Sequence, residues 1–149
     1  KEAEAYINLY FSRYPLVETF INDTIEKTRE SGYVTTMLGR RRYIKDINSR
    51  NRNLRQFAER TAVNSPIQGT AADIIKLAML RCEQAIRDNG LHATMLLQVH
   101  DELIFEVSKE DAMALGQVVH QCMEEAVKLS VPLKVDLKAG FNWREMEDI

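Results

Sequence analysis

The chain has 149 residues, 45% of them hydrophobic and 28% charged, a composition typical of a globular domain with its own core. No apolar run approaches the roughly 20 residues that cross a bilayer, which excludes a membrane protein, and the net charge of −2 favours no particular partner. The first ten residues lack a signal peptide and an initiator Met, so we expect a piece of a longer chain.

The charges are unevenly distributed along the chain. Residues 40–60 contain eight basic and two acidic side chains, whereas residues 101–149 contain eleven acidic and five basic ones. This pattern suits a protein that holds a polyanion in one place and a cation in another, although a solvated basic loop gives the same count. Cys82 and Cys122 stand apart on apolar helical faces, which predicts buried, reduced thiols and favours a cytoplasmic protein.

The first half of the chain is predicted to be mainly helical. A helix from Glu2 to about Arg13 ends before Pro15, which opens a second helix that Gly32 ends. Residues 33–44 form two short β-like runs around Gly39, a predicted hairpin, and a polar loop follows. Asn51 or Asn53 then caps a helix that continues to about residue 63.

The second half mixes helices and strands. Pro66 is expected to break the helix, and a new helix runs from near Thr70 to Asp88. After a β-rich stretch, Ser108 and Asp111 form a predicted capping box at the start of another helix. Alternating apolar residues over 133–137 predict a half-buried strand, so the fold class is α+β: helices followed by a β-β-α-β segment.

Three ionisable residues interrupt the apolar stretch from Thr94 to Val107. This stretch is too long for one strand of about five or six residues, and His and Asp tolerate positive φ, so we expect a hairpin that turns at His100-Asp101. Asp101 and Glu102 would then project from its tip, where carboxylate oxygens suit Mg²⁺. A solvated hairpin tip remains the alternative.

A second polar pattern lies before Pro66. Gln56, Arg60, Asn64 and Gln68 recur every four residues, a spacing that places side chains on one helical face. Such hydrogen-bond donors match the minor-groove acceptors that every base pair of DNA presents, although an exposed polar helix face would look the same. Arg55 and the segment GRRRY add charge that can bind phosphates.

Taken together, the segments GYVTTMLGRRRYI, AERTAVNSPIQGTAADIIKLAM and LLQVHDELIFEV resemble the C-terminal part of the polymerase domain of family A DNA polymerases, the bacterial DNA polymerase I family. The combination of V-H-D-E in an apolar hairpin with N-x-P-x-Q-G-T-A-A-D before it is specific, and the resemblance covers essentially the whole chain. It implies a right-hand polymerase fold. Residues 1 to about 90 would be fingers and palm-adjacent helices, with the small hairpin near 33–44, and residues 91–149 the palm β-β-α-β segment.

The resemblance also implies roles for individual residues. Asp101 would bind the catalytic pair of Mg²⁺ ions, with Glu102 as an auxiliary carboxylate beside it, and His100 would contact the backbone near the primer terminus. Arg60, Asn64 and Gln68 would contact the primer–template, largely through the minor groove. The implied activity is DNA-directed DNA polymerisation (nucleotidyl transfer) in DNA replication and repair, with primer–template DNA, deoxynucleoside triphosphates and the rest of the polymerase chain as partners.

No segment of this chain matches the family's other metal-binding aspartate or the fingers helix that grips the triphosphate. We therefore expect the 149 residues alone to be inactive. The main alternative is a DNA-binding module that keeps the polymerase fold without catalysis. An unrelated metal-dependent phosphohydrolase would need more ligands at the tip, and neither His92 nor His120 is expected to supply one. A structural fragment with a solvated tip is the last alternative.

Overall fold

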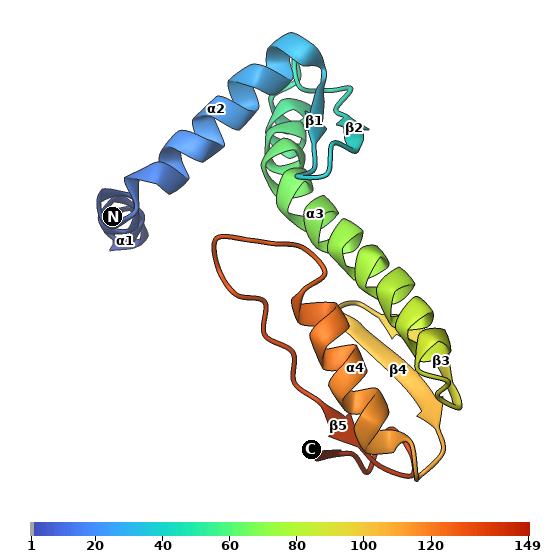
Figure 1. The fold of residues 1–149 in the computed structure, drawn as a ribbon. Helices are drawn as coiled ribbons and strands as arrows, with labels where there is room; N and C mark the ends of the chain where they lie inside the picture. Colours follow the sequence, from blue (N-terminus) through green and yellow to red (C-terminus); the bar gives the residue numbers. More distant parts are fainter. Residues whose placement is uncertain (1) are drawn as a thin grey trace. The chain divides into compact units, whose positions relative to one another are not determined.

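The computed structural model describes residues 2–149, and the chain divides into two compact units, residues 1–70 and 71–149. Helices and small antiparallel sheets alternate along it, which confirms the α+β class (Figure 1). The elements are α1 (Glu2–Arg13), α2 (Pro15–Ser31), β1 (Tyr33–Thr35), β2 (Arg41–Tyr43), α3 (Arg52–Asp88), β3 (Ala93–Val99), β4 (Glu102–Val107), α4 (Ala112–Glu124), β5 (Lys138–Ala139) and β6 (Glu147–Asp148).

The predicted boundaries of the first two helices are confirmed. Pro15 occupies the first turn of α2, where its missing N–H costs nothing, because the first turn has no intrahelical acceptor for that group. Gly32 ends α2 with φ of 78°, and its N–H donates to the carbonyl of Thr28 at 2.8 Å. A left-handed residue at this position satisfies a carbonyl that the helix leaves open, and glycine adopts it without strain.

The hairpin β1–β2 packs against the first part of α3 in residues 1–70. Tyr33 pairs with Tyr43 and Thr35 with Arg41, and Gly39 in the connecting turn has φ of 85°. The inward side chain of β1 joins a buried cluster with the following loop and with α3. Its members are Val34, Ile44, Ile47, Ala58 and Ala62. This cluster fixes the hairpin and the start of α3 in one body.

The expected helix break at Pro66 is wrong, because α3 runs without interruption from Arg52 to Asp88. A proline inside a helix removes one backbone hydrogen bond and costs about 3 kcal/mol. Neighbouring hydroxyls bond to the backbone here: Ser65 Oγ donates to the Thr61 carbonyl and Thr70 Oγ1 to the Pro66 carbonyl, both at 2.5 Å. Ala62 and Ser65 are buried beside the proline, so tertiary packing offsets a local preference for a break.

In residues 71–149 the C-terminal half of α3, the helix α4 and one face of the β3–β4 hairpin enclose a second core. Cys82, Ile86, Leu115 and Val119 form its buried centre. Side chains from both strands pack against it, which fixes the register of the hairpin. These are Ala93, Met95, Leu103, Phe105 and Val107. Both cysteines are free thiols, as predicted, but only Cys82 is buried as expected, whereas Cys122 is half-buried.

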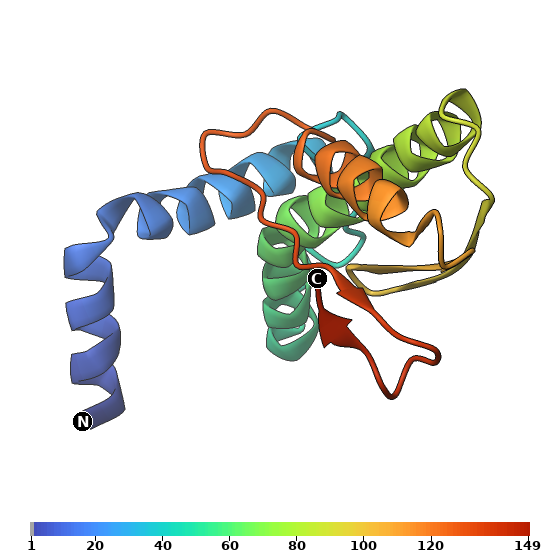
Figure 2. The same ribbon diagram turned by 60° about the horizontal axis from the view of Figure 1, so that its bottom comes forward.

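The predicted strand over residues 133–137 is wrong. No strand forms over residues 133–137, where the Val135 N–H donates to Glu124 Oε1 at 3.2 Å instead of to a neighbouring strand. The strand β5 begins just after these residues, at Lys138, and pairs with β6 in a separate two-stranded sheet (Figure 2). An alternating pattern specifies a half-buried surface, but a strand also needs a partner with free backbone groups.

The predicted capping box does not cap α4, because the helix begins at Ala112 with Asp111 as its N-cap residue. The Asp111 N–H donates to Ser108 Oγ at 3.2 Å in the turn before the helix, and the Asp111 carboxylate accepts from the His92 backbone N–H at 3.0 Å. The side chain therefore ties the loop before β3 to the start of α4. Within residues 2–149, no helix combines the length and the apolar character needed to cross a membrane.

Candidate functional site

The β3–β4 hairpin turns where the sequence predicts it. Val99 pairs with Glu102, which leaves His100 and Asp101 as the two-residue turn. His100 has φ of 55°, the one positive φ at a residue other than glycine within residues 2–149. A two-residue turn of this hand matches the twist of the strands, and Gln98 Nε2 donates to the His100 carbonyl at 2.5 Å. The local sequence thus fixes the position of the tip.

Asp101 and Glu102 are both exposed at this tip. Neither carboxylate forms a hydrogen bond or an ion pair with another described residue, so both keep their oxygens available for a ligand. Hard carboxylate oxygens are what Mg²⁺ binds, and it commonly uses one or two of them together with waters and phosphates. The tip can therefore supply some of the ligands of a magnesium site, with other ligands coming from elsewhere. Across residues 2–149, no group of three or more His, Cys, Asp or Glu side chains is placed to hold an ion.

The polar stripe lies on the first half of α3, in residues 1–70. Because the helix continues through Pro66, Gln68 stays in line with Gln56, Arg60 and Asn64 on one face. All four residues are exposed, and none of their side chains is hydrogen-bonded to another residue of the described chain. The structure thus keeps a row of free donors on one helix, about one per turn.

Arg55, the other predicted phosphate ligand, is held by its own unit. Its guanidinium donates to the Ser49 carbonyl at 2.9 Å and lies 3.9 Å from Glu59 Oε1. Glu59 also accepts from Arg29 at 2.7 Å, and Asn48 Nδ2 donates to the Arg29 carbonyl at 2.9 Å. Arg55 is therefore half-buried in a network that ties the loop before α3 to α2.

The two remaining histidines form local pairs. His92 is exposed, with Nδ1 3.3 Å from Asp111 Oδ2, and His120 Nε2 lies 3.4 Å from Glu124 Oε1 on the same helix. The hydrogen bond from the His92 backbone holds the pKa of Asp111 below its ordinary value. Each histidine thus pairs with one carboxylate, outside any group of three or more ligands.

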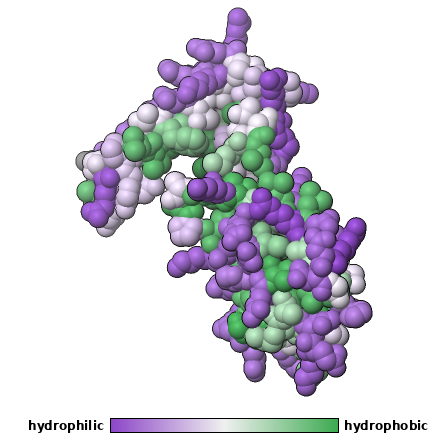
Figure 3. Space-filling view, in the orientation of Figure 1, coloured by the Kyte–Doolittle hydropathy of each residue, from purple (hydrophilic) through white to green (hydrophobic). Residues whose placement is uncertain are grey.

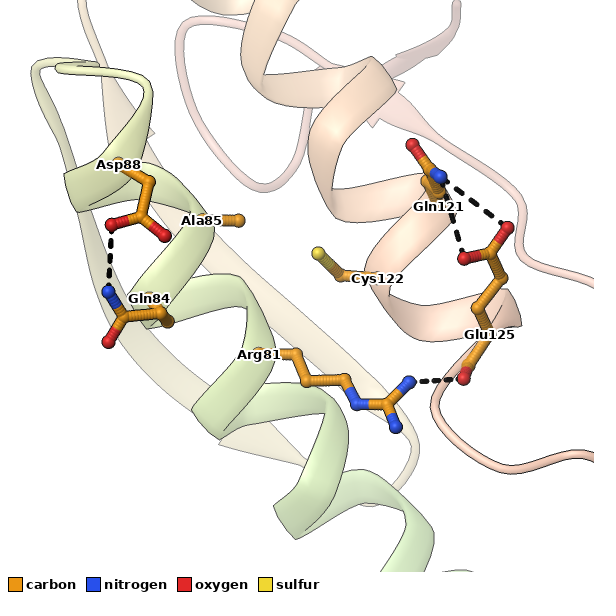
Figure 4. Close-up of a pocket in the computed structure, with 7 residues that line it drawn as sticks. All are labelled: Arg81, Gln84, Ala85, Asp88, Gln121, Cys122 and Glu125. Atoms are coloured by element: carbon orange, nitrogen blue, oxygen red, sulfur yellow. Dashed lines mark hydrogen bonds between the residues drawn. The ribbon is translucent and has the colours of Figure 1, made fainter.

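A shallow cavity of about 350 Å³ lies between α3 and α4 in residues 71–149 (Figure 4). Arg81 reaches across it and donates to the Glu125 backbone carbonyl, and Gln84 donates to Asp88 at 2.8 Å. Its polar groups are thus largely bonded to one another, and none of the predicted site residues lines it. The cavity serves as a packing boundary between two helices.

The structure adds one feature that the sequence analysis missed. Gly69 on α3 lies so close to the β1–β2 turn that a Cβ there would be 2.7 Å from Thr36 Cγ2. The carbonyl of Gly69 accepts from the Arg40 guanidinium at 3.0 Å, and Thr70 Oγ1 accepts from the Met37 N–H at 2.9 Å. A glycine inside a helix is a sequence signal for such close approach, but the break expected at Pro66 left Gly69 outside both predicted helices. The turn is therefore locked to the helix that carries the polar stripe.

The family model for DNA polymerase family A matches residues 1–145 of this chain. DNA polymerase I of Caldicellulosiruptor bescii is 51% identical over 145 residues, which is 97% of this chain and 17% of the relative. DNA polymerase I of Geobacillus stearothermophilus is 52% identical over 143 residues, 96% of this chain and 16% of the relative. The chain belongs to DNA polymerase family A. It spans about a sixth of the length of these curated relatives.

A solved structure of a polymerase domain also matches this chain. The POL domain of Pol1 from M. smegmatis, in complex with a DNA primer-template and dNTP, matches with a TM-score of 0.86 and 49% identity. The match covers 89% of this chain and 24% of the solved chain. The particular proteins that this chain is similar to are thus bacterial DNA polymerases I.

Proposed function

We propose that the protein containing these 149 residues is a DNA-directed DNA polymerase that adds deoxynucleotides to a primer 3′-OH on a DNA template. Its partners are primer–template DNA, deoxynucleoside triphosphates and the remainder of the polymerase chain. Two kinds of support exist: membership of the family, and the chemistry of the two groups of residues described above. Such an enzyme would work on DNA in replication and repair, in the cytoplasm.

The observation that carries the proposal is the turn at His100. It places two free, exposed carboxylates next to each other at the rigid end of a hairpin whose arms are anchored in a core. A polymerase needs such fixed carboxylates, because its protein part mainly positions reactants and neutralises phosphate charge. A solvated turn would have no need of an anchored tip.

Asp101 would hold a pair of Mg²⁺ ions together with an aspartate from outside this chain, and Glu102 would assist beside it. When bound, such ions lower the pKa of an attacking hydroxyl and stabilise the charge of the transferred phosphate. The contribution of the chain's own residues is geometric: the core under β3 and β4 keeps the tip from moving. His100, at the turn itself, would donate to the primer backbone through its imidazole.

The stripe on α3 would contact the duplex. Arg60, Asn64 and Gln68 can donate to purine N3 and pyrimidine O2, acceptors that every base pair presents at similar positions in the minor groove. Such contacts check the shape of a pair and leave its sequence unread, as templated synthesis requires. Arg55 would support this surface mainly by holding the loop before α3 in place, and its charge would add to the attraction of phosphate.

The assignment to parts of a right-hand polymerase fold is also a proposal. Residues 1 to about 90 would be fingers and palm-adjacent helices, and residues 91–149 would belong to the palm. The likeness to a solved polymerase domain supports both assignments. The β-β-α-β arrangement expected for the palm would require residues 133–139 to join the β3–β4 sheet in the whole enzyme.

The test is Asp101→Asn in the full-length parent enzyme, with Glu106→Gln as a matched control. Glu106 is an exposed carboxylate on the same hairpin, away from the tip. Asp101→Asn should lower templated incorporation by more than roughly a hundredfold, the most that is lost when a residue merely supporting a metal ligand is changed. Affinity for primer–template should stay within about threefold, because the minor-groove donors are intact.

Normal incorporation by Asp101→Asn would contradict the metal assignment. DNA binding without incorporation by the unaltered parent enzyme, at any Mg²⁺ concentration, would favour the DNA-binding module instead. Equal losses in Asp101→Asn and Glu106→Gln would mean that the hairpin responds to any charge change, and the tip would lose its special role.

A further inference from the structure

The outward face of the β1–β2 hairpin has two aromatic rings and a guanidinium in contact. Tyr33, Arg41 and Tyr43, called here the Tyr–Arg face, lie on the side opposite the buried Val34. The Arg41 guanidinium carbon is 4.7 Å from the centre of the Tyr33 ring. The rings of Tyr33 and Tyr43 meet edge to face, with centres 5.7 Å apart. Tyr43 remains 68% exposed, although burial of such a ring would be favourable.

This face is held rigidly. The Ile44 N–H after β2 donates to the Gly32 carbonyl at 2.9 Å, and the Thr36 N–H donates to the Arg40 carbonyl at 2.9 Å. The contact of Gly69 with Thr36 holds the turn against α3. Stacking between Arg41 and Tyr33 also limits the freedom of both side chains. A partner that binds here would therefore pay little of the ordering entropy that exposed long side chains otherwise lose.

The surroundings of the Tyr–Arg face are strongly basic. Exposed cationic side chains follow one another from the hairpin to the start of α3, with Asp46 as the one acidic residue between residues 40 and 58. They are Arg41, Arg42, Lys45, Arg50 and Arg52. In Figure 3 the region where Figure 1 labels β1 and β2 shows hydrophilic residues together with paler ones of intermediate hydropathy. Cations around exposed rings are complementary to a polyanion that also presents flat, apolar groups.

We propose that the Tyr–Arg face binds the unpaired template strand by stacking its bases on Tyr43 and on the free side of the Arg41 guanidinium. This inference rests on the proposed polymerase function and names the part of the nucleic acid that the hairpin takes. In a duplex the faces of the bases are covered by their neighbours, whereas unpaired bases expose them. Aromatic rings in a basic groove bind single strands for this reason, with little preference for sequence.

The experiment measures the affinity of the full-length parent enzyme for two labelled DNAs by fluorescence anisotropy. One is a primer–template with a single-stranded 5′ template overhang, and the other is the same duplex without an overhang. Tyr43→Ala and Arg41→Gln should each weaken binding of the overhang DNA by about tenfold, within the range of losing one stacked base. Tyr43→Ala should bind the blunt duplex as the unaltered enzyme does, and Arg41→Gln should weaken binding of the blunt duplex only by the small amount that loss of one surface charge causes. Tyr43→Phe should restore binding of the overhang, because it keeps the ring.

Arg42→Gln is the matched control for Arg41→Gln, since it removes the same charge from the opposite side of the same strand. Arg42→Gln should weaken binding of both DNAs to the same small extent. Equal losses for both DNAs in Tyr43→Ala would overturn the inference. A Tyr43→Ala enzyme with a lowered melting temperature and unchanged overhang binding would also overturn it, and would show that another part of the polymerase chain covers the ring. Failure of the unaltered enzyme to extend a primer would contradict the proposed function itself, which the overhang comparison does not test.

Discussion

At the scale of single residues, Gly69 determines how closely the hairpin turn approaches α3. A Cβ at this position would meet Thr36 Cγ2 at 2.7 Å, and Thr36 is nearly buried. Thr36 cannot rotate freely, because its Oγ1 accepts from the Arg40 N–H at 3.1 Å. The methyl group of alanine therefore has no room unless the turn moves.

Gly69→Ala should destabilise residues 1–70 by about 1–3 kcal/mol, the usual cost of overpacking. Hydrogen exchange of the Met37 and Arg40 amides should become faster, since both are held near this contact. The second substitution Thr36→Ser removes Cγ2 and keeps the hydroxyl, so the double variant should regain most of the protection. Unchanged exchange in Gly69→Ala alone would show that the approach is looser than the structure indicates.

Cys82 lies in the core under β3 and β4, and burial raises the pKa of its thiol from 9.0 to about 12, with a further contribution from the neighbouring Cys122. The nucleophilic form of a cysteine is the thiolate, which this core suppresses. Iodoacetamide at about pH 8 should therefore alkylate Cys122 well before Cys82 in the folded protein, and peptide mass spectrometry can locate the label. Faster modification of Cys82 than of Cys122 would contradict this assignment.

The same raised pKa gives a pH dependence of stability. Between pH 9.0 and about 12 the unfolded chain releases the Cys82 proton while the folded chain keeps it. Unfolding is then favoured as the pH rises. The contribution of Cys82 to the free energy of unfolding is therefore complete below pH 9.0 and declines above it. Urea unfolding measures the free energy of unfolding at each pH. Between about pH 8 and about pH 10.5 this free energy should fall less in Cys82→Ala than in the unaltered protein, because all other groups titrate in both proteins. Identical losses in the two proteins would refute this linkage.

At the scale of elements, α3 begins with a side-chain cap. Asn51 Oδ1 accepts from the Asn53 N–H at 2.9 Å and from the Leu54 N–H at 3.4 Å, two donors that have no acceptor within the helix. Asn51→Ala should lower the free energy of unfolding of residues 1–70 by about 1 kcal/mol, and Asn51→Ser should restore most of it. Asn53→Ala is the control, since Asn53 already lies inside the helix. Chemical denaturation measures both, and equal effects would mean that the cap is unimportant.

Local chemistry made several elements predictable from sequence. Pro15, Gly32, Gly39 and Asn51 act through their own backbone preferences or short-range hydrogen bonds, and the structure has a boundary or turn at each. The turn at His100 belongs to the same class, because a two-residue hairpin needs a residue that accepts positive φ. These features depend on a few neighbouring residues, which a sequence displays directly.

Features that depend on distant contacts were not predictable in the same way. The helix continues through Pro66 because the packing of buried residues such as Ala62 and Ser65 offsets the lost hydrogen bond. Residues 133–137 alternate like a strand and still lack a partner, so the pattern alone was insufficient. For the candidate site, the sequence placed Asp101 and Glu102 at the tip and the stripe on one helical face. The contacts of Arg55 with Ser49 and Glu59 depend on how the loop before α3 folds, which no sequence pattern indicated.

At the scale of the whole molecule, we expect this chain to provide only part of what a polymerase requires. Its hairpin tip supplies carboxylates but no group of three or more potential metal ligands within residues 2–149. Primer extension by the 149-residue chain alone, in Mg²⁺, should therefore show no templated incorporation, with the full-length parent enzyme as the positive control. Incorporation by the isolated chain would mean that the tip completes a metal site from residues that the structure leaves apart.

The sheet of β3 and β4 has a practical consequence for handling the isolated chain. It contains two strands, so each strand has one edge whose backbone groups are unpaired within the sheet, and Leu96 and Leu97 are about half exposed. Such edges are templates for aggregation between copies. A preparation of these 149 residues alone should therefore need low concentration or a solubilising fusion partner. A lysine in place of Leu97 would be the first substitution to try for keeping the copies apart.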